Sequence, residues 1–244
     1  MSSIIKIENM SFSYDNASIL KDINLDIHEN DFVGIIGPNG GGKTTLLKIL
    51  LGFLKPTSGN VSILGSAPEQ VSKFIGYVPQ YSEMDKQFPI RVKDVIVMGL
   101  CESSSYFPRF SKHSYEKVFE VMELLKIREL AEKKFGELSG GQKQRTLICR
   151  AIVSNPKMLF LDEPTASVDA SIEEDIYKIL SGFNSKITIL LVSHDVGFIS
   201  NYVNRVACVN RSLVIHPVHE ISSNHALSHA YDNHTTAIHH KCGL

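Results

Sequence analysis

The chain has 244 residues, 43% of them hydrophobic, which is sufficient for one large domain or two small ones with a buried core. Its 25 Lys and Arg against 26 Asp and Glu provide no overall basic field, so nucleic acid is not expected as a partner. The four cysteines are scattered without a CxxC pair, which fits a protein of the reducing cytosol better than one that is stabilised by disulfides. We expect no membrane span, because the apolar runs are far shorter than roughly 20 residues, and no signal peptide, because the start MSSIIKIENM lacks a basic flank and a long apolar core.

Short runs that alternate apolar and polar residues predict strands in the first part of the chain. These runs are IIKIEN, INLDIHE and FVGIIG, with SYDNAS as a turn between the first two. Beyond Thr44 the spacing changes to that of a buried helix, which should end before the turn KPTSG. The apolar positions of that predicted helix are Leu46, Leu47, Ile49, Leu50 and Phe53.

The rest of the chain predicts a helical stretch between two groups of strands. NVSILG and FIGYVP are strand candidates, and a mostly helical segment follows from about Tyr81 to Ala151. The continuous apolar runs MLFLDEP and ITILLVSH are typical of parallel strands buried on both faces, with SIEEDIYKILSGF as the crossover helix between them. The predicted fold class is therefore α/β with a helical insertion. The apolar faces expected on its helices are Val118, Val121, Met122 and Leu125, and Ile172, Ile176, Ile179 and Leu180.

The stretch GPNGGGKTT lies where a strand should turn into a helix, and it fits the phosphate-loop pattern Gly-x-x-x-x-Gly-Lys-Thr. Glycines let backbone N–H groups point inward at an anion, and the helix that begins near Lys43 adds its positive end. We expect Lys43 to reach the β- and γ-phosphates and the Thr44 hydroxyl to coordinate Mg²⁺. The members of this loop are Gly37, Pro38, Asn39, Gly40, Gly41, Gly42, Lys43, Thr44 and Thr45.

Two further segments narrow the function. LSGGQKQR at 138–145 opens a predicted helix with Ser139 as its N-cap, and MLFLDEP ends a buried strand in Asp162 and Glu163. With these motifs in this order, residues 4–215 resemble the ATP-binding subunits of ABC transporters. That resemblance implies a P-loop NTPase core (mixed sheet, RecA-like) with an N-terminal antiparallel β subdomain and an inserted α-helical subdomain at about 81–151. It places the ABC ATPase domain at 1–215 and leaves a His-rich tail at 216–244.

The resemblance also assigns roles to residues around ATP and Mg²⁺. Tyr14 lies where the family has an aromatic that stacks on adenine, although it also fits a surface tyrosine of a strand. Gln80 matches the glutamine that contacts Mg²⁺ or the attacking water. Asp162 matches the carboxylate that holds Mg²⁺, and Glu163 the one that polarises the water. His194 matches the histidine that touches the γ-phosphate; taken alone, it would instead fit a core residue.

Other residues are implied to act on the ATP of a second subunit. In this family the signature segment, LSGGQ in this chain, of one subunit closes on ATP held by the phosphate loop of the other subunit. This arrangement implies a head-to-tail homodimer. Asp169 matches the loop that crosses to the partner, although TASVDAS departs from the more frequent Gly-Leu-Asp. The signature residues are Ser139, Gly140, Gly141 and Gln142.

The cargo is indicated by weaker resemblances. FPIRVKDVIVMG at 88–99, GPNGGGKTTL and VNRVACVNRSL resemble subunits of zinc and manganese uptake systems. The implied partners are integral membrane permease subunits and, indirectly, a solute-binding protein, with this subunit peripheral at the cytoplasmic face of the membrane. The alternatives are an importer for an iron chelate or cobalamin, a soluble ABC protein acting on ribosomes or in DNA repair, and a non-catalytic nucleotide-binding module.

The last part of the chain is rich in histidine, with seven of the ten histidines at 216–242. Imidazole suits Zn²⁺, but no fixed zinc-finger spacing is present. A zinc-sensing or zinc-buffering tail, a polar tail that binds metal loosely and a pH-responsive tail all remain open. The candidate tail ligands for zinc are His225, His229, His234, His239 and His240.

Overall fold

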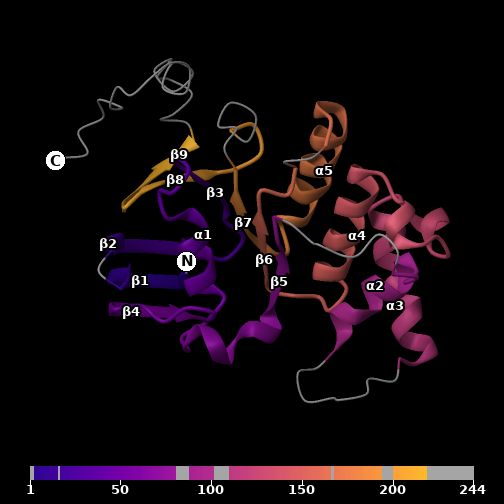
Figure 1. The fold of residues 1–244 in the computed structure, drawn as a ribbon, viewed down its shortest axis with the longest axis horizontal. Coiled ribbons are helices and arrows are strands. Elements are labelled where there is room, and N and C mark those ends of the chain that lie inside the picture. Colours follow the sequence, from indigo (N-terminus) through magenta and orange to yellow (C-terminus); the bar gives the residue numbers. More distant parts are fainter. Residues whose placement is uncertain are drawn as a thin grey trace. The chain divides into compact units, whose positions relative to one another are not determined.

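The computed structural model describes residues 3–15, 17–80, 88–101, 110–165, 168–193 and 200–218 (Figure 1). They form two compact units. The first contains the described residues of Met1–Val71 and Leu190–Leu244, and the second those of Ser72–Ile189. Five short 3₁₀ helices lie at Pro68–Gln70, Ser72–Phe74, Met98–Leu100, Arg128–Leu130 and Phe135–Glu137.

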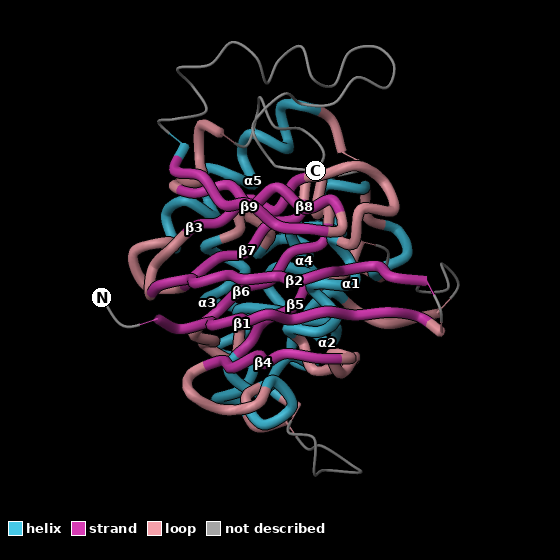
Figure 2. Tube along the Cα trace, turned by 90° about the vertical axis from the view of Figure 1, so that its left-hand side faces the viewer, coloured by secondary structure: helices cyan, strands magenta, loops and turns pink. Residues whose placement is uncertain are grey.

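An antiparallel sheet in the first unit has the strand order β2-β1-β4. Its strands are β1 (Ser3–Tyr14), β2 (Ala17–His28) and β4 (Ser58–Ile63), which lie side by side in Figure 2. Ile5 pairs with Ile27 on one side and Ile63 on the other, and all three side chains are buried. The predicted N-terminal antiparallel β subdomain is therefore confirmed.

Part of a second, mixed sheet lies in the first unit and carries the phosphate-loop segment. Its order is β7-β3-β8-β9, with β3 (Phe32–Ile36) parallel to β8 (Arg205–Asn210) and β8 antiparallel to β9 (Ser212–Pro217). The predicted strand β3 is present, but all five of its residues are buried, so it does not alternate between a buried and an exposed face as expected. Helix α1 (Lys43–Leu50) follows, and its Leu46, Leu47, Ile49 and Leu50 are buried.

One predicted core position of α1 is wrong. Phe53 is 66% exposed. The helix ends at Leu50, so Phe53 lies in the following turn, where helical spacing no longer directs its side chain to the buried face.

The second unit contains a parallel strand pair and four helices (Figure 1). Strand β5 (Ile75–Val78) pairs with β6 (Met158–Asp162), and the boundary between the units falls inside β7 (Thr188–Val192). The helices are α2 (Val92–Val97), α3 (Lys112–Leu124), α4 (Gly140–Ile152) and α5 (Ala170–Phe183).

The helical faces follow the predicted periodicity in part. The fully buried predicted positions are Val118 and Met122 of α3, Leu125 just after it, and Ile176 and Leu180 of α5. The other predicted positions, Val121, Ile172 and Ile179, are half-buried. Tyr177 on α5 is also fully buried, although the apolar pattern did not include it. The chain is thus α/β, with an antiparallel sheet, a mixed sheet and helices in the predicted insertion.

Two features bear on the ends of the domain and on membranes. Among the described residues, no helix has both the length and the hydropathy needed to cross a membrane. Strand β9 runs to Pro217, and residues 219–244 lie outside the described part, so the domain boundary at 215 stays a prediction.

Candidate functional site

The phosphate loop lies directly on the backbone of the neighbouring strand. At Gly37, where φ is 151°, a Cβ atom would lie 1.9 Å from the Val209 carbonyl oxygen of β8. The Arg211 N–H donates to the Gly41 carbonyl at 3.0 Å, so the chain on either side of Asn210 holds the loop. A side chain at Gly37 would separate the loop from β8, because this contact is between backbone atoms.

Lys43 opens α1 and turns back onto the loop. Its side chain is 6% exposed, and Nζ donates to the carbonyls of Gly37 at 2.8 Å and Pro38 at 3.1 Å. Thr44 is exposed and Thr45 half-buried beside it. A buried ammonium, the unpaired N–H groups of a helix start and a glycine-rich curve together provide a site for a phosphate group.

The end of β6 and the residues after it, Asp162 to Thr165, form a segment that we call the carboxylate segment, and it lies in the second unit. Asp162 is only 3% exposed, and Glu163 follows it with a left-handed φ of 46°. Gln80 Nε2 donates to Glu163 Oε2 at 2.6 Å. The register explains this contact: Val78 of β5 pairs with Leu161 of β6, so the residues two positions further along leave the sheet together.

The negative charge of Asp162 also affects Tyr77 on the neighbouring strand β5. Burial, and in second place the negative charge of Asp162, raise the pKa of Tyr77 above its ordinary value. Within the second unit, Asp162 offers a carboxylate and Gln80 an amide oxygen, which are hard oxygen donors of the kind that Mg²⁺ takes. The residue types therefore fit a magnesium ion that arrives with a nucleotide.

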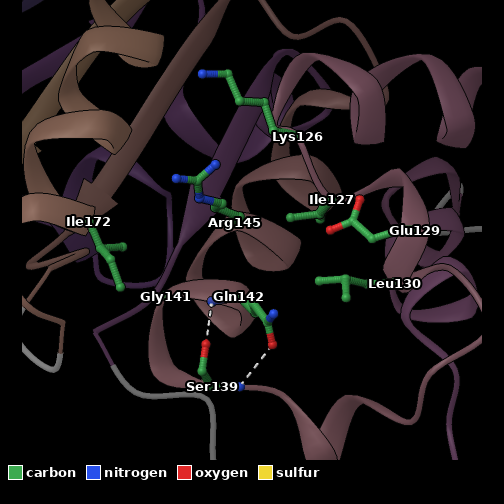
Figure 3. Close-up of a pocket in the computed structure, with 9 residues that line it drawn as sticks. All are labelled: Lys126, Ile127, Glu129, Leu130, Ser139, Gly141, Gln142, Arg145 and Ile172. Atoms are coloured by element: carbon green, nitrogen blue, oxygen red, sulfur yellow. Dashed lines mark hydrogen bonds between the residues drawn. The ribbon is translucent and has the colours of Figure 1, made fainter.

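The signature segment begins helix α4 in the second unit (Figure 3). Ser139 Oγ accepts from the Gln142 N–H at 3.4 Å, and the Ser139 N–H donates to Gln142 Oε1 at 3.1 Å. This reciprocal pair is a capping box, as expected from a Ser three residues before a Gln. Gly141 packs against α5, since a Cβ atom there would lie 2.6 Å from Ile172 Cγ2.

A pocket of about 270 Å³ lies beside the signature segment (Figure 3). Arg145 lines this pocket; its Nη1 donates to the Leu125 carbonyl at 3.0 Å, and its Nη2 pairs with Asp175 at 3.3 Å. Arg145 belongs to the run LSGGQKQR, but the sequence did not identify it as a pocket residue, because its contacts with Leu125 and Asp175 join segments that are distant in the chain. The lining residues are Lys126, Ile127, Glu129, Leu130, Ser139, Gly141, Gln142, Arg145 and Ile172.

The remaining candidate residues are placed as follows. Tyr14 ends β1 46% exposed, with its ring edge-on to Phe12 at 4.8 Å between centroids. Asp169 is the N-cap residue of α5. His194 and the five candidate tail ligands lie outside the described residues, whereas His216 belongs to β9 and pairs with Val206. Within the described ranges, no three His, Cys, Asp or Glu side chains gather as a metal site.

The sequence model of the family described as ABC transporter matches residues 20–166. The chain belongs to the ABC transporter family. It is an ATP-binding, ATP-hydrolysing subunit of such a transporter, as the resemblance predicted. ABC cassettes form dimers and, in importers, partner with membrane permease subunits.

Relatives of this ABC subunit match most of its length. A "Probable metal transport system ATP-binding protein" of Chlamydia pneumoniae is 40% identical, covering 84% of this chain and 86% of the relative. The "Zinc uptake system ATP-binding protein ZurA" of Listeria innocua is 36% identical, covering 88% and 85%. The "Manganese transport system ATP-binding protein MntB" of Halalkalibacterium halodurans is 34% identical, covering 95% and 93%.

Solved structures of ABC cassettes share the fold. The ADP conformation of MJ1267, an ATP-binding cassette of an ABC transporter, has a TM-score of 0.83 and 26% identity, covering 95% of this chain and 99% of that one. A dimeric post-hydrolysis state of the cassette MJ0796, bound to ADP and Pi, has a TM-score of 0.75 and 26% identity, covering 88% and 98%. The predicted P-loop NTPase fold is therefore confirmed.

Proposed function

We propose that this ABC subunit powers the import of zinc or manganese ions. The support for the cargo is that relatives covering more than four-fifths of the chain carry the names of metal, zinc and manganese transport subunits. The observation that carries the hydrolytic role is the contact between Gln80 and Glu163, which combines a carboxylate and an amide at the end of a buried strand. Such a pair can orient a water molecule for attack on a phosphoryl group.

In this proposal, the residues of the first unit bind the nucleotide. Tyr14 stacks on adenine with its exposed ring. Lys43 exchanges its bonds to the Gly37 and Pro38 carbonyls for the β- and γ-phosphates, which are stronger, charged acceptors. Thr44 provides its hydroxyl to Mg²⁺. The glycine-rich backbone from Gly37 to Gly42 supplies the remaining N–H donors.

The residues of the second unit carry the hydrolytic step. Glu163 accepts a hydrogen bond from the attacking water, and Gln80 limits the rotation of its carboxylate. Asp162 and Gln80 provide oxygen ligands for Mg²⁺, which when bound neutralises charge on the phosphates. His194, which lies outside the described residues and in neither described unit, is proposed to contact the γ-phosphate.

We further propose a head-to-tail homodimer in which each copy completes the other's site. Ser139, Gly140, Gly141 and Gln142 would approach the γ-phosphate of ATP bound to the second copy, and Asp169 would contact that copy as well. The dimer would work at the cytoplasmic face of the membrane with permease subunits and, indirectly, a solute-binding protein. The 88–99 segment, with exposed Phe88 and Met98, is the proposed contact with the permease.

The nucleotide roles are tested by comparing Lys43→Ala with Glu163→Gln. Lys43→Ala should weaken ATP binding itself, because it removes the buried ammonium. Glu163→Gln should bind ATP as the unmodified chain does and lose turnover, because the phosphate loop is unchanged while the water loses its acceptor. Equilibrium binding of a fluorescent ATP analogue and phosphate release measure the two effects. Wild-type hydrolysis by Glu163→Gln would refute the assignment.

The cargo is tested by uptake of radiolabelled zinc and manganese at limiting external metal, with the native chain or Lys43→Ala. Selective loss of one ion's uptake in the variant would identify that ion. Unchanged uptake of both, with the variant expressed and no redundant importer, would refute metal import and favour an iron chelate or another small solute.

The tail is a separate proposal: His225, His229, His234, His239 and His240 bind Zn²⁺ and adjust uptake to internal zinc. The support for this proposal is the density of imidazoles, seven in the 27 residues of the stretch 216–242. A chain that ends at Val218 should lose zinc bound by the full chain in equilibrium dialysis. Equal zinc binding by both chains would refute the proposal.

A further inference from the structure

Thr165, two residues after Glu163, is tied to helix α5 by its side chain. Thr165 Oγ1 donates to Glu173 Oε1 at 2.6 Å and lies 3.1 Å from the Tyr177 hydroxyl. A threonine hydroxyl has one proton, and the carboxylate can only accept, so that proton belongs to the bond with Glu173. The Tyr177 hydroxyl therefore donates to Thr165, and one oxygen joins two residues of α5.

This network lies against the buried face of α5. Tyr177 is fully buried between the core residues Ile176 and Leu180, and Thr165 and Glu173 are half-buried. Breaking a short hydrogen bond to a partly buried carboxylate costs free energy, so Thr165 stays bound to Glu173. The end of the carboxylate segment is thereby fastened to a helix packed in the core of the second unit.

The fastening matters because the backbone at Glu163 is in a disfavoured conformation. Its φ of 46° is left-handed, which a non-glycine residue keeps only when the structure on both sides holds it. On the preceding side, β6 is held by β5 through the pair Val78 and Leu161. On the following side comes Pro164, whose ring restricts φ, and then the anchored Thr165.

Glu163 thus lies between two anchors. Its side chain accepts from Gln80 at 2.6 Å, a contact that depends on where the backbone places the carboxylate. Release of Thr165 would let residues 163–165 relax toward an ordinary backbone conformation, and the carboxylate would turn away from Gln80. The hydroxyl of Thr165 can therefore influence the carboxylate without contacting it.

We propose that Thr165, held by Glu173 and Tyr177, is a positioning residue that keeps the Glu163 carboxylate oriented for hydrolysis. This inference rests on the proposed role of Glu163. It assigns to the hydroxyl of Thr165 a part in turnover and none in nucleotide binding.

The test compares Thr165→Val with Thr165→Ser in the full-length chain. Valine has nearly the shape of threonine but lacks the hydroxyl, so kcat for ATP should fall roughly tenfold, the effect of losing a hydrogen bond to a charged group. The KM for ATP should stay within about twofold, because the phosphate loop is unaltered. Serine keeps the hydroxyl, so Thr165→Ser should retain a kcat close to that of the unmodified chain.

A second pair tests the same bond from α5 and serves if Thr165→Val does not fold. Glu173→Gln keeps an acceptor oxygen and should preserve kcat, whereas Glu173→Leu should lower it as Thr165→Val does. A merely structural role would lower Tm in these variants and leave the kcat of the folded protein unchanged. That result, or equal kcat in both members of each pair, would overturn the inference.

Glu163→Gln separates this inference from the proposed function. If Glu163→Gln hydrolyses ATP normally, the role of Glu163 itself is wrong. If Glu163→Gln is inactive while Thr165→Val and Glu173→Leu keep full turnover, the proposed function stands and only the positioning role fails. In the Glu163→Gln background, Thr165→Val should lower the residual rate no further, because the group that it positions is already absent.

Discussion

Gly37→Ala should disrupt the phosphate loop far more than Gly40→Ala, although both replace a glycine of the same loop by the same residue. Both positions have positive φ, 151° at Gly37 and 77° at Gly40, so each variant places an alanine in a backbone region that it disfavours. The two differ in the space available. The new Cβ at Gly37 would meet the Val209 carbonyl oxygen at 1.9 Å, whereas nothing lies within 4 Å at Gly40.

The expected loss of unfolding free energy has two parts, one from the backbone conformation and one from the steric contact of the new Cβ. The backbone term costs about 1–2 kcal/mol and applies to both variants. Overpacking adds about 1–3 kcal/mol at Gly37 alone. The upper end applies there, because Cβ contacts below 3.0 Å are essentially never found and the obstructing atom belongs to the backbone of a paired strand. We expect Gly37→Ala to lose about 4–5 kcal/mol of unfolding free energy and Gly40→Ala about 1–2 kcal/mol.

Urea denaturation of the full chain measures the unfolding free energy, and titration with a fluorescent ATP analogue measures binding. Gly37→Ala should also weaken ATP binding by at least about tenfold, since displacement of the loop moves the carbonyls that hold Lys43. Gly40→Ala should bind within a few-fold of the unmodified chain. Equal destabilisation by the two variants would refute the argument that contact with β8, rather than φ, requires glycine at position 37.

Three further predictions concern single side chains. Ser139→Ala should lower the unfolding free energy by about 1 kcal/mol through loss of the α4 capping box, as Ser111→Ala should for α3; no loss in urea denaturation would contradict the cap assignment. Arg205→Ala should lower the unfolding free energy by about 2 kcal/mol, because it removes the guanidinium that bonds the Asp31 carboxylate at 2.8 Å, and that carboxylate is only 13% exposed. A change below about 0.5 kcal/mol would exclude a stabilising ion pair. Burial raises the pKa of the Cys149 thiol well above its ordinary value, so the unfolded chain releases this proton first and stability should fall by about 1.4 kcal/mol per pH unit above about pH 8.5. Cys149→Ala should remove that part of the slope in denaturation curves between pH 8 and 10, and an identical slope in both chains would count against a buried neutral thiol.

The local features of this chain could be predicted because they depend on residues close in sequence. Short apolar runs predicted β1, β2 and β3, with alternation along the first two, and the glycine-rich run predicted the turn into α1. The capping box at Ser139 and Gln142 joins residues three positions apart, so its donors and acceptors are visible in the sequence. Phe53 was misassigned because the sequence does not mark where α1 ends to within one turn.

The contacts between distant segments were decided only by the tertiary structure. Gln80 and Glu163 are 83 positions apart, and they meet because β5 and β6 pair in a particular register. Likewise, the sequence supplies Thr165 and Tyr177, but only the packing of α5 places their hydroxyls together. The sequence by itself determined which elements form and which chemical groups the nucleotide site has, because hydrogen bonding within a helix, turn or loop is local. The tertiary structure decided which of these groups touch, because strand pairing and core packing depend on many residues at once.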